Sequence, residues 1–171
     1  MTRKGYWILG VLLTVFLMGF INPVLAQTTS QFTDNGDGTV TDSKTGLMWT
    51  QKDSGAASGR CLSWDASDAY VGNLQTGGHA DWRMPTIAEL KTIFNPAYTV
   101  KGFPIEGRTT DVHYPPVFAA GGAYWLWSSE KVDACCARGL GFNSGHVHEG
   151  TRDFCGTSGV RGVRGATRDK P

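Results

Sequence analysis

The chain has 171 residues and a nearly balanced charge, with 16 basic and 15 acidic side chains. Domains that bind nucleic acid carry a basic patch, so a nucleic-acid partner is not expected for this chain. The 23 glycines favour short strands, many turns and long ordered loops.

The N-terminal region has the pattern of a secretory signal peptide. Arg3 and Lys4 form a basic start, and an apolar run follows from Ile8 to Ile21. Val24-Leu25-Ala26 then has the modest or small side chains that suit cleavage after Ala26. The apolar run is short for a membrane span. We therefore expect residues 1–26 to be removed, and the mature protein to be periplasmic or secreted with no membrane span.

Cleavage after Ala26 would remove 26 of the 171 residues and leave 145. A chain of that length forms one domain and buries roughly two thirds of its unfolded surface. Arg3 and Lys4 would be lost, so 14 basic residues would face 15 acidic ones, a formal charge of −1. The sequence thus predicts a single domain at residues 27–171, with a core at about 32–165.

Turn residues and hydrophobic periodicity divide the rest of the chain into short elements. Asn35-Gly36-Asp37-Gly38 is a strong hairpin turn. A calcium loop is the alternative interpretation of Asp34, Asp37 and Asp42, but their spacing lacks the alternate ligands and closing Glu of an EF-hand. In chain order we expect strands at 32–33, 39–41 and 47–50, a helix at 64–74 capped by Ser63, an extended run at 82–84, a helix at 86–94, a long loop at 96–122, and strands at 124–128, 138–142, 145–149 and 160–164.

The stretch from Gly77 to Phe94 organises these elements. Pro85 keeps the residue before it out of the helical region, so 82–84 should be extended. Thr86 and Glu89 have the spacing of a capping box, in which each side chain accepts a hydrogen bond from the backbone N–H of the other residue. The apolar residues that follow form one stripe, which predicts a well-capped core helix preceded by a buried Trp82.

The strand at 124–128 carries bulky side chains on both faces, which predicts a central strand covered on both sides. After it, a two-residue turn at Asn143-Ser144 would pair Leu140 with Val147, both facing the core. His146 and His148 would then lie on the other face, over glycine backbone with open space around them. The full expected core comprises Trp49, Trp64, Trp82, Pro85, Leu90, Phe94, Trp127, Leu140 and Val147.

All four cysteines, Cys61, Cys135, Cys136 and Cys155, lie in the part expected to be exported. An even number in an oxidising compartment predicts two disulfides. A bridge between adjacent cysteines is disfavoured, because disulfide geometry usually sets the two Cα atoms further apart than neighbours lie. A metal site built from thiolates is the alternative, but no CxxC pair supports it.

The hairpin register extends this argument. It places Cys136 opposite residue 151, four residues before Cys155. We therefore favour Cys136–Cys155 with Cys61–Cys135 over the swapped pairing, Cys135–Cys155 with Cys61–Cys136. Free thiols or an adjacent bridge remain open, because sequence alone does not fix connectivity.

Several segments together resemble one known family. They are 32–42, 45–49, 77–90, 127–129 and 160–164, with Asp81-Trp82-Arg83-Met84-Pro85-Thr86 as the most specific part. On these motifs the chain resembles the Lcl C-terminal domain family, over 32–164. The same motif is also similar to a segment of formylglycine-generating enzymes, which have a variant C-type-lectin fold.

The resemblance implies an α+β fold: a compact C-type-lectin-like domain with two helices packed on irregular, mostly antiparallel sheet, long loops and disulfides. It implies an exported bacterial protein. The best-understood relative is the C-terminal domain of a collagen-like adhesin, which binds sulfated polysaccharides and forms a trimer. This chain has no collagen repeat, and Val71 and Gly162 stand where the family often has cysteines.

The function that we expect is a non-catalytic, adhesin-like module that recognises a glycan or a cell-surface protein, without a cofactor. The candidate ligand-binding residues are Arg152, Arg168, His146, His148 and Trp125. Arg161 and Arg164 are three positions apart, so a regular strand would point them to opposite faces and leave at most one in an exposed patch.

Three alternatives remain. His146 and His148 on one strand face could share a zinc or copper ion, completed by Glu149, His79 or His113. An enzyme of the formylglycine-generating type would need reactive cysteines. A structural subunit of a surface assembly, with or without oligomerisation, is compatible with the sequence.

Overall fold

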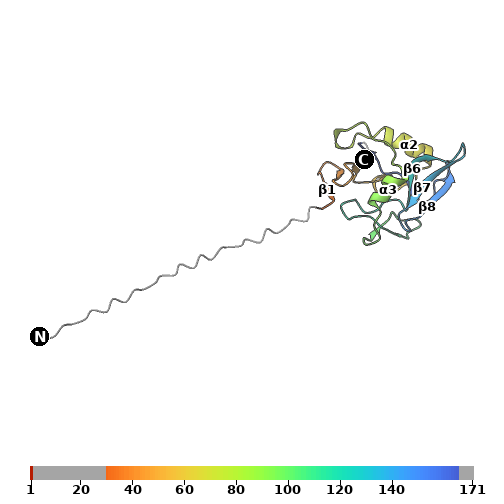
Figure 1. Cartoon of the computed structure of the whole chain (residues 1–171). Coiled ribbons are helices and arrows are strands. Elements are labelled where there is room, and N and C mark those ends of the chain that lie inside the picture. The colour runs from red at the N-terminus through yellow and green to blue at the C-terminus, as the bar shows by residue number, and fades with distance from the viewer. Residues whose placement is uncertain (2–29, 166–171) are drawn as a thin grey trace.

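A computed structural model describes Met1 and residues 30–165 (Figure 1). Apart from Met1, the expected signal peptide lies outside the described residues, and so does Arg168. Within the described part, the fold is α+β, with three short α-helices beside small sheets. No helix in this part has the length and apolar character needed to cross a membrane.

Two four-stranded sheets form the framework. The first has the order β1-β2-β3-β10 and is antiparallel; it contains Phe32–Asp34, Thr39–Asp42, Met48–Thr50 and Val163–Arg164. The second has the order β8-β7-β6-β9; it contains Val147–Thr151, Cys136–Gly141, Trp125–Lys131 and Ser158–Gly159, with β9 parallel to β6. A two-stranded sheet of β4 (Val100–Lys101) and β5 (Asp111–Val112) interrupts the expected long loop.

Only the end of the strand expected at 160–164 forms a strand, β10, and the separate strand β9 lies just before the expected range. β9 pairs with β6, and β10 pairs with β3. Between them Arg161 is fully buried, where its guanidinium donates to the Asp53 carboxylate at 3.0 Å and lies over the rings of Tyr114 and Phe118. This ion pair joins the segment between β9 and β10 to the start of α1 (Ser54–Ser58), a short helix that Asp53 caps.

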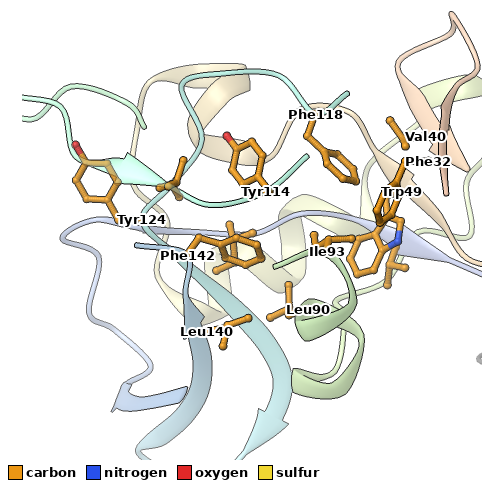
Figure 2. Close-up of a cluster of buried hydrophobic side chains, with 14 of the residues drawn as sticks. Phe32, Val40, Trp49, Leu90, Ile93, Tyr114, Phe118, Tyr124, Leu140 and Phe142 are labelled. Carbon is orange, nitrogen blue, oxygen red and sulfur yellow. The ribbon is translucent and has the colours of Figure 1, made fainter. Parts of the chain in front are cut away.

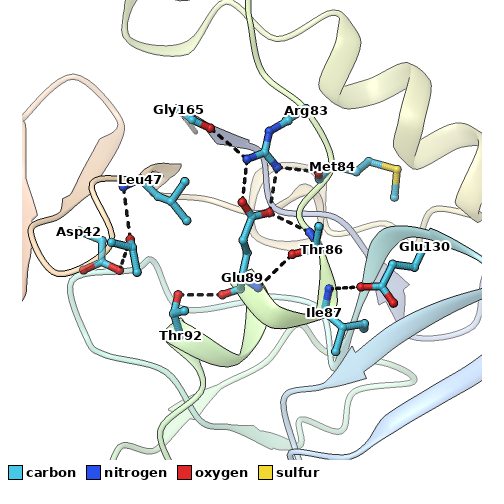
Figure 3. Close-up of polar contacts among 11 residues, drawn as sticks. Asp42, Leu47, Arg83, Met84, Thr86, Ile87, Glu89, Thr92, Glu130 and Gly165 are labelled. Carbon is cyan, nitrogen blue, oxygen red and sulfur yellow. Dashed lines mark hydrogen bonds and ion pairs between the residues drawn. The ribbon is translucent and has the colours of Figure 1, made fainter. Parts of the chain in front are cut away.

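The central stretch folds as its capping box predicts. In α3 (Ile87–Ile93) the Thr86 hydroxyl accepts from the Glu89 N–H at 3.1 Å, and the Glu89 carboxylate accepts from the Thr86 N–H at 2.9 Å. Arg83 donates two further hydrogen bonds to that carboxylate, at 2.7 and 2.8 Å (Figure 3). The pKa of Glu89 is lowered, because burial, which raises it, is outweighed by these hydrogen bonds from Arg83 and Thr86.

α3 lies against β6 and β7, with Leu90 and Ile93 directed toward Leu140 and Phe142 (Figure 2). On the other side of β6, Trp127, Ala137 and Trp64 form a second apolar cluster with α2 (Trp64–Gly72), which Ser63 caps. β6 therefore lies between β7 and β9 and is covered on both faces, as its sequence predicts.

Most of the expected core is buried, with one correction. Trp49, Trp64, Trp82, Pro85, Leu90, Trp127 and Leu140 are buried and Phe94 is half-buried, but Val147 is 40% exposed. Val147 does pair with Leu140, in the register expected for the hairpin. It is exposed because β8 is the edge strand, and α3 packs against β6 and β7 instead.

The favoured disulfide pairing is wrong. The bridges are Cys61–Cys155 and the adjacent pair Cys135–Cys136. Cys136 does lie opposite Thr151, but the chain then turns away, and Ser158 returns to bond Leu62. This return places Cys155 beside Cys61, with Cα atoms 5.4 Å apart.

The adjacent bridge lies in the turn between β6 and β7. The Asp133 carboxylate accepts from the N–H groups of Cys135 and Cys136, at 2.8 and 2.9 Å. These hydrogen bonds fix the backbone of the turn that carries the bridge.

Candidate functional site

The candidate site is centred on Trp125, the first residue of β6. Its ring lies over glycine backbone, because a Cβ added at Gly139 would come within 1.7 Å of Nε1, and one at Gly150 within 2.5 Å of Cη2. The two glycines belong to β7 and β8, and because they have no side chains the indole can lie directly on the backbone of these strands. The ring centroid of Trp127 lies 4.6 Å away, which supports the indole from the side of the second apolar cluster.

Two more rings contact Trp125. The centroid of Phe154 is 6.1 Å from the Trp125 ring, and that of His148 is 5.9 Å away. Centroid separations in this range are those of direct aromatic contact. Phe154 remains 46% exposed and His148 is exposed, so this row of rings offers aromatic surface to solvent.

The row of rings borders an open hollow of about 540 Å³. We call it the Trp125 hollow; it is lined by Thr110, Tyr124, Trp125, Gly141, Asn143, His148, Glu149, Phe154 and Thr157. Binding sites for small molecules combine aromatic walls with a few polar groups that fix orientation. Here Thr110, Asn143 and Thr157 supply neutral donors and acceptors at the rim.

The polar rim contains no lysine or arginine. Glu149 borders the hollow, but successive side chains of a strand point to opposite faces, so its carboxylate is directed away from His148. That carboxylate accepts from the Arg138 Nε at 3.0 Å. The surface of the hollow is therefore aromatic and polar, with little fixed charge.

Backbone hydrogen bonds on one side and a disulfide on the other set the position of Phe154. Arg152 donates its backbone N–H to the Cys135 carbonyl at 2.8 Å, and its own carbonyl accepts from the Trp64 N–H at 2.8 Å. One residue after Phe154, Cys155 is bridged to Cys61. The exposed ring thus projects from a segment that is held on both sides.

Of the predicted ligand-binding residues, the structure brings Trp125, His148 and His146 together. The His146 and His148 ring centroids are 6.4 Å apart. The expected open space above the glycines is partly filled, because the Trp125 ring occupies the position over Gly139.

Arg152 lies elsewhere and is not a free cation. It forms an ion pair with Asp65, and its guanidinium carbon lies 4.7 Å from the centroid of the Trp64 ring. Arg161 is buried, whereas Arg164 is partly exposed and donates to Asp81 at 2.7 Å. Arg164 lowers the pKa of Asp81 chiefly by this hydrogen bond.

The histidine metal triad is not assembled. Glu149 points to the opposite face from His148 and pairs with Arg138. His79 contacts Trp82, and His113 is hydrogen-bonded to the Tyr98 carbonyl. Among residues 30–165, the only group of three metal-type side chains with ligand atoms within 4.8 Å of one another is Asp133, Cys135 and Cys136, and its two sulfurs are bonded to each other.

Sequence reasoning missed Phe154, Asn143, Thr110 and Thr157. The available signal was Phe154 itself, a large aromatic residue between Asp153 and Cys155 in a polar loop. Its contact with Trp125 is made from the position before Cys155, whose bridge to Cys61 the sequence did not assign.

A larger hollow of about 710 Å³ lies beside the Cys61–Cys155 bridge. Arg60, Tyr70 and Phe103 are among its lining residues. Phe103 is only 5% exposed and stacks on Tyr124, so it presents little ring surface. The Trp125 hollow is the better candidate because its rings are accessible.

Comparison with family models matches residues 38–164 to the Lcl C-terminal domain. The chain belongs to the Lcl C-terminal domain family. The match extends from the end of the first hairpin turn to β10 and contains every residue that lines the Trp125 hollow. A comparison with curated proteins finds none that matches this Lcl C-terminal domain.

Proposed function

We propose that the protein is an exported, non-catalytic module that binds a glycan in the Trp125 hollow. The observation that carries the proposal is the row of contacting rings formed by Phe154, Trp125 and His148, with neutral polar groups beside it. A sugar ring has an apolar C–H face and a polar edge of hydroxyls. The first packs on aromatic rings, and the second exchanges hydrogen bonds with side chains such as Asn143 and Thr157.

Two further observations support a binding role. The small α+β domain, with short helices and irregular sheets, is compatible with the C-type-lectin-like fold that we propose for it. All four cysteines are in disulfides, which suits an oxidising, exported location and leaves no thiol for chemistry of the formylglycine-generating type.

A glycan array with three proteins tests the proposal. Wild type should bind one or more glycans, and Phe154→Ala should weaken that binding about tenfold, since an aromatic contact of about 1.4 kcal/mol corresponds to that factor. The matched control is Tyr98→Ala, which removes a ring that is 40% exposed but does not line the Trp125 hollow. No binding by wild type, or equal binding by Phe154→Ala, would overturn the proposal.

A further inference from the structure

We infer that the glycan bound in the Trp125 hollow is uncharged, an inference that rests on the proposed function. The hollow has no lysine or arginine in its lining. A sulfate or carboxylate that leaves water must gain a cation or several donors in return, or binding is costly. An anionic sugar would lose hydration in this hollow without an ion pair to replace it.

The nearest arginine along the strands does not supply the missing charge. Arg138 of β7 lies directly opposite Glu149 of β8. Both side chains are on the opposite face of these strands from His148. Its guanidinium is shared between the carboxylates of Glu149, at 3.0 Å, and Glu130, at 3.9 Å. An arginine that already has two acidic partners offers little net positive charge to a ligand.

The same holds for most arginines in the described part of the chain. Five of them have a carboxylate partner within 4.0 Å: Arg83, Arg138, Arg152, Arg161 and Arg164. Arg152 is the one closest in sequence to Phe154, and it is held by Asp65 and the Trp64 ring. The cations that flank the loop of Phe154 therefore stabilise the fold instead of forming an anion site.

The surface that remains matches a neutral sugar. The Trp125 Nε1 is turned toward the backbone of Gly139 and has no hydrogen-bond partner, so the indole offers its face and not its N–H to a ligand. The exposed ring of Phe154 extends the apolar surface. Asn143 and the threonines at the rim can each both donate and accept, which is what neutral hydroxyls require.

The test measures affinity for neutral oligosaccharides and for the O-sulfated counterpart of each. The panel contains glucose, mannose, galactose and N-acetylglucosamine oligomers, titrated calorimetrically into wild type, Phe154→Ala, Tyr98→Ala and Arg168→Ala. We expect wild type to bind a neutral oligomer, and to bind the sulfated counterpart of that oligomer more weakly. The neutral affinity should change less than about twofold between about 0.05 and about 0.5 M NaCl, because salt screens charge pairs and not ring contacts. It should fall about tenfold in Phe154→Ala and stay unchanged in Tyr98→Ala, whose ring does not line the hollow.

The possible failures are distinguishable. Tighter binding of a sulfated oligomer that is lost in Phe154→Ala would overturn the uncharged ligand and leave the proposed function standing. Sulfated binding that is unchanged in Phe154→Ala and lost in Arg168→Ala would overturn both, because the ligand would then bind at Arg168 and not in the Trp125 hollow. Binding of no oligomer in the panel would overturn the proposed function, and the inference with it.

Discussion

Replacing Glu89 by alanine should destabilise the protein by about 3 kcal/mol. Its carboxylate, 2% exposed, accepts from two nitrogens of Arg83 and from the Thr86 N–H. Removing one partner of a fully buried pair costs about 3–5 kcal/mol, and losing a helix cap costs about 1 kcal/mol. The Arg83 side chain is 39% exposed, so water can partly rehydrate it, which keeps the total near the lower end of that range.

The assay is urea unfolding followed by far-ultraviolet circular dichroism. A loss of about 3 kcal/mol corresponds to a melting temperature roughly 6 to 12 °C lower for a domain of this size. The control is Asp111→Ala, which breaks an exposed pair with Lys101 and should cost less than about 1 kcal/mol. A Glu89→Ala variant within about 1 kcal/mol of wild type would refute the reasoning.

Glu89→Gln separates charge from shape through its pH dependence. The pKa of Glu89 in the folded state is below its ordinary value of 4.5, so the charged carboxylate stabilises the folded protein. That contribution is fully present above pH 4.5 and is lost as the pH falls through the lowered pKa. The stability difference between wild type and Glu89→Gln should therefore shrink in acid, and a difference that stays constant would contradict this sign.

Three further changes test the fold and the backbone on which the Trp125 ring lies. Replacing Cys61 and Cys155 together by serine should cost about 4 to 5 kcal/mol, because the bridge closes a loop of 94 residues, and non-reducing peptide mapping should recover it in wild type. Trp82→Ala should cost about 3 to 5 kcal/mol in urea unfolding, since the ring is 5% exposed; a melting temperature within a few degrees of wild type would contradict this. Gly139→Ala should displace the Trp125 ring and cost about 1 to 3 kcal/mol, visible as a changed near-ultraviolet signal.

Elements governed by local rules could be predicted from the sequence. The helix at α3 follows from Pro85, Thr86 and Glu89, whose effects act within one turn of the chain. The β7–β8 register follows from the position of the Asn143-Ser144 turn. The role of Arg83 within the family motif becomes clear only in three dimensions, where it joins α3 to the Gly165 carbonyl at the end of β10.

Features that depend on distant segments could not be predicted. The pairing of Cys155 depends on the path of the chain after Thr151. The break between β9 and β10 lies at Arg161, which pairs with a buried Asp53 more than a hundred residues earlier. Val147 carries an apolar side chain at a position that an edge strand leaves uncovered.

Only part of the candidate site could be predicted from the sequence, for the same reason. Trp125 and His148 were recognisable from the aromatic strand and the hairpin register. Phe154 contacts Trp125 from an irregular loop, next to a cysteine that forms a disulfide. No periodic sequence pattern indicates such a position. Arg152 was expected in the site because it is basic, but its ion pair with Asp65 on α2 is a contact that no local rule indicates.

The central claim is that ligand binds on the rings of the Trp125 hollow. Chemical-shift mapping of the ¹⁵N-labelled protein, titrated with each oligosaccharide of the panel in turn, tests it most directly. We expect the largest shifts at the Trp125 indole N–H and at the backbone amides of Asn143, His148, Phe154 and Thr157. Shifts confined to Arg60, Leu62 and Phe103 at the larger hollow, or no shifts with any oligosaccharide, would contradict it.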